Sequence, residues 1–157
     1  MPTKPKNRTF WPLFFMVLSV LFFIWLFSSE DKLTKLSSEF MKKQISSTGE
    51  LAVVNYIDTH FNYSKNGLPY KSTFIEFGST TCRACKEMEE VMIEIKKNYH
   101  KEVNVVFVDI SNKQNQSLIR YYGVSLVPMQ VFLDSVGDEY FRHTGFISTD
   151  SISKILH

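Results

Sequence analysis

The sequence has only two cysteines, Cys82 and Cys85, and two residues separate them. So few cysteines exclude the disulfide framework of a small secreted domain. A disulfide between them closes a very short loop and removes little entropy from the unfolded chain, so stabilisation is a poor reason for the pair. A four-cysteine zinc site is also excluded, because no second Cys-x-x-Cys occurs.

An excess of charge of either sign is also lacking. The 18 basic and 16 acidic side chains leave a formal charge of +2. Composition therefore gives no case for nucleic acid or for a strongly acidic partner. The four histidines are scattered without ligand spacing, so no metal is expected. At 157 residues the chain is long enough for one domain of ordinary size.

Charged residues are absent from Phe10–Phe27, which reads FWPLFFMVLSVLFFIWLF. A helix of this length just spans the hydrocarbon core of a bilayer. Basic residues precede the segment, so the positive-inside rule places residues 1–9 in the cytoplasm and the remainder outside. We therefore expect residues 1–9 to be a cytoplasmic basic tail and residues 10–27 to be a transmembrane signal anchor.

A cleaved signal peptide is the alternative interpretation of this segment. Its cleavage site requires small residues at alternate positions. Here Ser28 and Ser29 follow two large apolar residues, and the first alanine of the chain is Ala52. No cysteine stands directly after the apolar segment, which excludes a lipid-modified anchor. An uncleaved single-pass anchor is therefore favoured.

Residues 28–48 are polar and are expected to form a stalk, and residues 49–157 are expected to form the folded domain. Leu51–Tyr56 suits a strand, although residues 51–61 are equally compatible with a helix. Asn62–Lys71 is expected to be a loop. The later strands are predicted at Ser72–Phe77, Val103–Ile110, Met129–Leu133 and Glu139–His143. The helices are predicted at Cys82–Tyr99, Gln114–Tyr122 and Thr149–Leu156.

This order of elements predicts a central mixed sheet with helices on both faces. Val103–Ile110 is almost continuously apolar, which is typical of a strand that is covered on both sides. The predicted fold class is therefore α/β.

A Cys-x-x-Cys at a strand-to-helix junction is typical of redox chemistry. Cys82 lies at the helix N-terminus, where unpaired N–H groups stabilise a thiolate, and Arg83 adds a positive charge. Cys85 follows about one helical turn later and can attack a mixed disulfide formed by Cys82. Cys82 is therefore the predicted nucleophile and Cys85 the predicted resolving thiol.

Two further residues fit this chemistry. Glu76 precedes Cys82 by six positions, and a partly buried carboxyl there can accept the proton of Cys85. The alternative is an ordinary solvated glutamate on an edge strand. Pro128 either marks a strand boundary or forms a cis Val127–Pro128 bond that places backbone groups beside the disulfide, where a substrate strand can pair with them.

The segments TFIEFGSTTCRACK, VFVDI, YYGVSLVPMQVFLD and HTGF together resemble the thioredoxin family over about Gly49–His157. In particular they are similar to the C-terminal thioredoxin-like domain of transmembrane thiol:disulfide interchange reductases. The resemblance implies a thioredoxin-like fold, with Glu76 as the buried acid and Pro128 as the cis-proline. It also implies a redox-active disulfide as the only redox group.

The sequence departs from the family at three positions, and one of them is Glu76, where thioredoxins more often have aspartate. Thr81 stands where most members have tryptophan, and Met129 stands where most have threonine. Both positions are expected on the substrate-facing surface, together with Val127 and Arg83.

The expected function is that of a membrane-anchored reductase of exported protein disulfides, on the outer side of a bacterial cytoplasmic membrane. Its electrons would come from a separate membrane protein, because only one membrane span is predicted. The alternatives are a disulfide oxidase or isomerase of the same fold, a non-enzymatic anchored adaptor, and a copper chaperone that uses the cysteines with Met129. A location in the endoplasmic reticulum fits the same physics.

Overall fold

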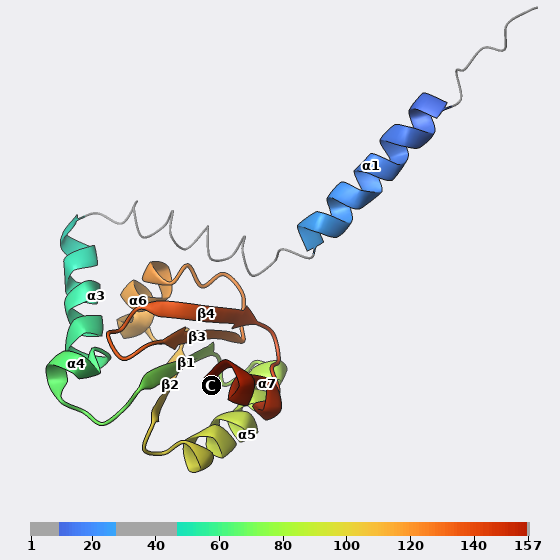
Figure 1. Ribbon diagram of the computed structural model, residues 1–157. Coiled ribbons are helices and arrows are strands. Elements are labelled where there is room, and N and C mark those ends of the chain that lie inside the picture. The colour runs from blue at the N-terminus through green and yellow to red at the C-terminus, as the bar shows by residue number, and fades with distance from the viewer. Residues whose placement is uncertain (1–9, 28–46, 157) are drawn as a thin grey trace, which may run out of the picture.

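The computed structural model describes residues 10–27 and 47–156 (Figure 1). The expected cytoplasmic tail, and the expected stalk up to residue 46, lie outside the described residues. The elements in chain order are α1 (Phe10–Phe27), α3 (Ser47–His60), α4 (Tyr63–Asn66), β1 (Ser72–Gly78), α5 (Arg83–Asn98), β2 (Val103–Asp109), the 3₁₀ turn η1 (Lys113–Asn115), α6 (Gln116–Tyr121), β3 (Met129–Leu133), β4 (Glu139–Thr144) and α7 (Thr149–Leu156).

Helix α1 covers the same residues as the apolar segment, so a helix is present where one was expected. Among the residues that the structure describes, no helix combines the length and the hydropathy of a membrane span.

The four strands form one mixed sheet in the order β2-β1-β3-β4. Strands β1 and β2 are parallel, whereas β3 pairs antiparallel with both β1 and β4. Helices α5 and α7 cover one face of the sheet, and α3 and α6 cover the other (Figure 1). The predicted mixed sheet with helices on both faces is therefore confirmed.

Alternation along β1 divides its side chains between two cores. Ile75 and Phe77 pack with residues of α3 and α6, whereas Phe74 packs with α5 and α7. Successive residues of a strand point to opposite faces. Glu76 and Gly78 therefore share the α5 face with Phe74, which brings a carboxyl under the start of α5.

The expected strand at Leu51–Tyr56 is wrong, because this segment belongs to α3. Val53 and Ile57 are buried four residues apart on one face of the helix, and Phe61, directly after its last residue, is buried at the same spacing. The helical alternative for residues 51–61 is confirmed. The loop expected at Asn62–Lys71 also contains the single turn α4.

Strand β2 lies at the edge of the sheet, and its side chains pack on both faces, with Val108 in the core under α3 and α6 and Val103 in the core under α5 and α7. Most of its side chains are only partly buried, and Phe107 is 41% exposed. The apolar sequence of β2 is compatible with a buried strand, but its position next to β1 alone leaves its outer side open. Helix α7 has the predicted bounds, and Ser148 Oγ accepts a hydrogen bond from Ser151 N at 3.3 Å, as a cap does.

Candidate functional site

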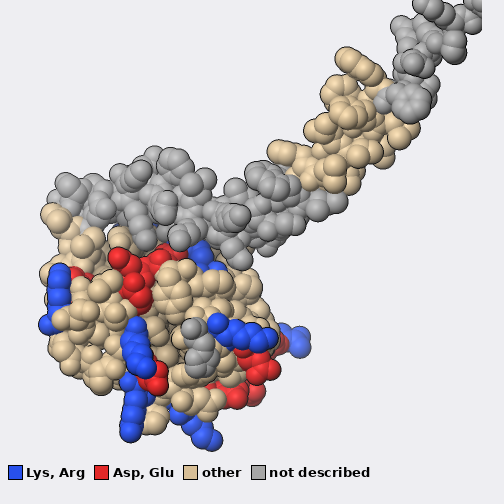
Figure 2. Space-filling view, in the orientation of Figure 1, with Lys and Arg blue, Asp and Glu red and all other residues tan. Residues whose placement is uncertain are grey.

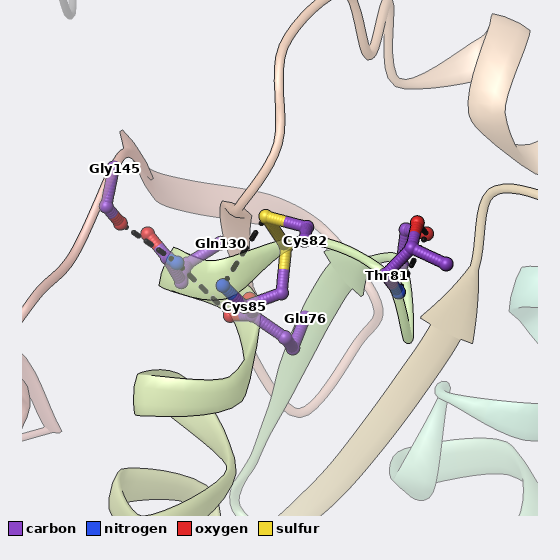
Figure 3. Close-up of a disulfide and its surroundings, with 7 residues drawn as sticks. Glu76, Thr81, Cys82, Cys85, Gln130 and Gly145 are labelled. Atoms are coloured by element: carbon purple, nitrogen blue, oxygen red, sulfur yellow. Dashed lines mark hydrogen bonds between the residues drawn. A yellow bond between two sulfur atoms is a disulfide. The ribbon is translucent and has the colours of Figure 1, made fainter.

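The two cysteines lie where β1 passes into α5 (Figure 3). Cys82 is the N-cap of α5, and its Sγ accepts a hydrogen bond from the backbone N–H of Cys85 at 3.3 Å. The two residues form a disulfide. A helix N-terminus carries a partial positive charge, so this position stabilises a thiolate on Cys82 after reduction.

The two sulfurs differ in access to solvent. Cys82 is partly exposed, whereas Cys85 is buried with 3% exposure. An incoming disulfide can therefore reach Cys82 first. The side chain of Arg83 is 97% exposed, and its Nε lies 3.8 Å from Glu87 Oε1, so its charge faces solvent beside the disulfide.

Gly78 leaves room for the ring of Phe107 beside the disulfide. A Cβ atom at this position would lie 2.8 Å from Cε2 of Phe107 and 3.4 Å from Cβ of Cys85. A side chain at Gly78 would therefore displace the Phe107 ring of β2 next to Cys85.

Glu76 is fully buried in the middle of the sheet, paired with Phe107 on one side and Gln130 on the other. Burial raises its pKa to about 8, and the hydrogen bond from Gln130 opposes part of that rise. The alternative of a solvated glutamate on an edge strand is therefore wrong. A carboxyl with this pKa holds a proton near neutrality and can exchange it with a nearby thiol.

Gln130 is a site residue that the sequence analysis missed. Its Nε2 donates to Glu76 Oε2 at 2.9 Å and to the carbonyl oxygen of Gly145 at 3.1 Å (Figure 3). The available signal was its place in MQVFL, since one polar side chain in an apolar central strand requires a buried partner.

The Val127–Pro128 peptide bond is cis. Pro128 is buried directly before β3, and its carbonyl oxygen accepts a hydrogen bond from Gly145 N at 2.8 Å. The neighbouring Leu126 is 68% exposed, so this loop presents apolar surface to solvent. The role of Pro128 in pairing with a substrate strand remains a prediction.

The four expected substrate-facing residues do not share one environment. Thr81 and Arg83 are exposed and Val127 is half-buried. Met129 is only 3% exposed and packs in the core between the sheet and the α3–α6 layer, so the surface position expected for its side chain is wrong. The reason is its pairing with Phe77, since directly paired residues face the same side of a sheet.

A thioredoxin-like domain model matches residues 41–157. The chain belongs to the thioredoxin-like family. Proteins of this family exchange thiols and disulfides through a Cys-x-x-Cys pair, so the expected enzyme class, a thiol–disulfide oxidoreductase without a further cofactor, is confirmed. Within the described part of the chain, no three potential metal ligands come together.

Two curated proteins are similar to this thioredoxin-like protein over part of their length. The chloroplastic thioredoxin-like protein HCF164 of Arabidopsis thaliana is 30% identical over 81 residues, which cover 47% of this chain and 31% of that protein. The thiol:disulfide interchange protein TxlA homolog of Synechocystis is 33% identical over 72 residues, covering 46% and 38%. The match thus spans about a third of each relative.

Solved structures confirm the fold alone. A thioredoxin-2 of a malaria parasite superposes with a TM-score of 0.51 at 23% identity, covering 55% of this chain and 81% of that one. The exposed lipoprotein thioredoxin Etrx1 of Streptococcus pneumoniae gives a TM-score of 0.50 at 21% identity, with coverages of 57% and 86%.

Proposed function

We propose that this thioredoxin-like protein reduces disulfides of exported proteins, with Cys82 as the nucleophile, Cys85 as the resolving thiol and Glu76 as the proton acceptor. One arrangement carries the proposal: an accessible sulfur at a helix N-terminus, a buried second sulfur, and a fully buried carboxyl of raised pKa on the same side of the sheet. The name of the Synechocystis relative, a thiol:disulfide interchange protein, agrees with it.

The reaction balances within the two cysteines and one substrate disulfide. In the reduced protein the Cys82 thiolate attacks the substrate disulfide, forming a mixed disulfide and releasing one substrate thiolate. Cys85 then transfers its proton to Glu76 in its ionised form, and attacks the Cys82 sulfur. This step forms the Cys82–Cys85 disulfide and releases the second substrate thiolate. The substrate gains two electrons and the cysteine pair loses two.

The direction of electron flow is set by the reduction potential of the Cys82–Cys85 pair. We expect the full chain, equilibrated in detergent against glutathione and dithiothreitol buffers, to give a potential near that of thioredoxin, about −270 mV. A potential near −120 mV would assign the protein to the oxidases. The absence of a reversible two-electron couple would contradict thiol–disulfide exchange altogether.

We also propose that Phe10–Phe27 anchors the protein in the bacterial cytoplasmic membrane, with the thioredoxin-like domain on the outer side. The support is the uncharged apolar sequence, its helical conformation in α1 and the basic residues before it. Basic and acidic side chains are interspersed over the face of the domain shown in Figure 2. The electrons would then come from a separate membrane protein.

Fractionation of cells that produce the full chain tests the anchor. We expect the protein in the membrane fraction after alkaline washing, and external protease should digest the domain once the outer envelope is opened. A charge at the centre of the segment, Leu18→Arg, should weaken insertion by roughly 2.5–3.5 kcal/mol, whereas Leu18→Ile should leave it unchanged. Recovery of the unmodified chain in the soluble fraction would contradict the anchor.

A further inference from the structure

A row of four paired residues crosses the sheet below the disulfide. Glu76 pairs with Phe107 of β2 and with Gln130 of β3, and Gln130 pairs with His143 of β4. Directly paired residues point to the same face, so the row faces α5 and α7. Glu76 and Gln130 in its centre are both fully buried.

The side-chain nitrogen of Gln130, Nε2, donates two hydrogen bonds. Its two N–H groups donate to Glu76 Oε2 and to the carbonyl oxygen of Gly145. The carbonyl of Gly145 can only accept, which fixes the orientation of the amide. Gly145 N in turn donates to the carbonyl oxygen of Pro128. One side chain thus connects the buried carboxyl, the loop after β4 and the cis-proline.

The two oxygens of the Glu76 carboxyl are not equivalent. Oε2 accepts the hydrogen bond from Gln130, whereas Oε1 is buried and has no hydrogen-bond partner among the described residues. A carboxylate oxygen that already accepts an N–H is the less basic of the two. The incoming proton therefore goes to Oε1.

We propose that Gln130 is a positioning residue of the exchange reaction, which holds Oε2 of Glu76, leaves Oε1 to receive the proton of Cys85, and ties this carboxyl to Gly145 beside the cis-proline. The inference rests on the proposed function, because it assigns a helper to the proton acceptor of that reaction. In the assisted step the Cys85 S–H bond breaks and an O–H bond forms on Oε1. The freed electron pair of Cys85 then attacks the Cys82 sulfur, and the bond between this sulfur and the substrate breaks as the substrate thiolate leaves.

Other titratable groups lie on the same face of the sheet as this row. They are Cys82 and Cys85 from α5, Asp109 at the end of β2 and His143 from β4. Asp109 Oδ1 accepts from Ser111 N at 2.8 Å, and His143 Nε2 lies 3.3 Å from the carbonyl oxygen of Phe146. His143 is the neighbour of Gln130 in the row, so its replacement is the matched control.

The test replaces Gln130 by methionine, which has a similar length and no donor. The pKa of Glu76 is read from the infrared carbonyl band of the protonated carboxyl in the oxidised full chain. The rate of mixed-disulfide resolution is measured against pH in single turnovers. Without the donor, we expect both the pKa and the midpoint of the profile to rise by about one to two pH units. His143→Gln should change neither the pKa of Glu76 nor the midpoint of the pH profile.

A double-mutant cycle separates this role from general damage. In a Glu76→Gln background, Gln130→Met should no longer move the pH profile. An unmoved pKa of Glu76 in Gln130→Met, or an equal shift of the profile in the Glu76→Gln background, would overturn the proposal. If Gln130→Met fails to fold, Gln130→Asn, whose amide is too short for both contacts, should shift the pKa in the same direction, and no shift would count against the proposal.

Failure of this inference and failure of the proposed function give different results. If the unmodified protein exchanges no disulfides, the proposed function is wrong, and the infrared titration still decides whether Gln130 acts on Glu76. If the unmodified protein exchanges disulfides normally, and Gln130→Met changes neither the pKa of Glu76 nor the midpoint of the pH profile, then only the role proposed for Gln130 is wrong.

Discussion

Replacing Cys82 by serine should abolish disulfide reduction, whereas replacing Cys85 by serine should trap the protein as a mixed disulfide with its substrate. Cys82 carries the accessible sulfur at the start of α5, whereas Cys85 is buried and cannot begin the reaction. A serine hydroxyl is essentially un-ionised near neutral pH, so we expect Cys82→Ser to lose roughly a thousandfold or more in rate.

The Cys85→Ser variant keeps the attacking thiolate but cannot form the Cys82–Cys85 disulfide. The first step should therefore proceed, and close to one substrate molecule should remain bound per chain. Mass spectrometry under non-reducing conditions detects this adduct, and dithiothreitol should release it. Cys82→Ser provides the matched control, because it should form no adduct.

Alkylation rates give an independent measure of the same assignment. In the reduced protein, a small alkylating reagent should modify Cys82 much faster than Cys85, because the latter is only 3% exposed. Adduct formation by Cys82→Ser, or full turnover by Cys85→Ser, would mean that the roles of the two sulfurs are reversed.

Local sequence patterns were enough to predict the elements that carry the disulfide. The Cys-x-x-Cys, the apolar spacing in α5 and the acidic-to-basic order of its charges all lie within one helix. Helix α7 and strand β3 likewise have the predicted bounds. These features depend on residues close together in the chain, which is why the sequence alone defines them.

Prediction failed where an element depends on distant neighbours. The apolar residues around Val53 fit a strand over six positions, and only their continuation to Phe61 reveals the helix. The exposed edge position of β2 follows from the order of strands, which no local pattern encodes. The sequence analysis assigned Met129 to the site and missed Gln130, because the register of the strands decides which of the two residues faces the disulfide.

Glu76 should make the protein markedly less stable at high pH, by roughly 5 kcal/mol between pH 4 and pH 9. Burial raises its pKa from an ordinary 4.5 to about 8. Between these values the folded protein keeps a proton that the unfolded chain has released. The contribution to stability is therefore fully present below about pH 4.5 and is lost as the pH rises through about 8. Urea unfolding of the oxidised full chain in detergent measures it.

The Glu76→Gln variant should remove this dependence, since an amide does not titrate and can still accept the hydrogen bond from Gln130. We expect it to be the more stable protein at pH 9, while exposed Glu90→Gln should retain the pH dependence of the original. An unchanged dependence in Glu76→Gln would show that the carboxyl does not hold its proton in the folded state.

The size of this effect bears on why the carboxyl is there. The free energy of unfolding of a domain is only about 5–15 kcal/mol. A buried glutamate that lowers it by several kcal/mol at high pH is therefore strongly destabilising. The hydrogen bond from Gln130 offsets only part of the free-energy cost of desolvation. Oε1 has no hydrogen-bond partner among the described residues. A residue that only filled space at this position would be better as leucine or methionine. The cost is explained if Glu76 takes the proton of Cys85, and Glu76→Gln should therefore gain stability at pH 9 and lose resolution rate in the same protein.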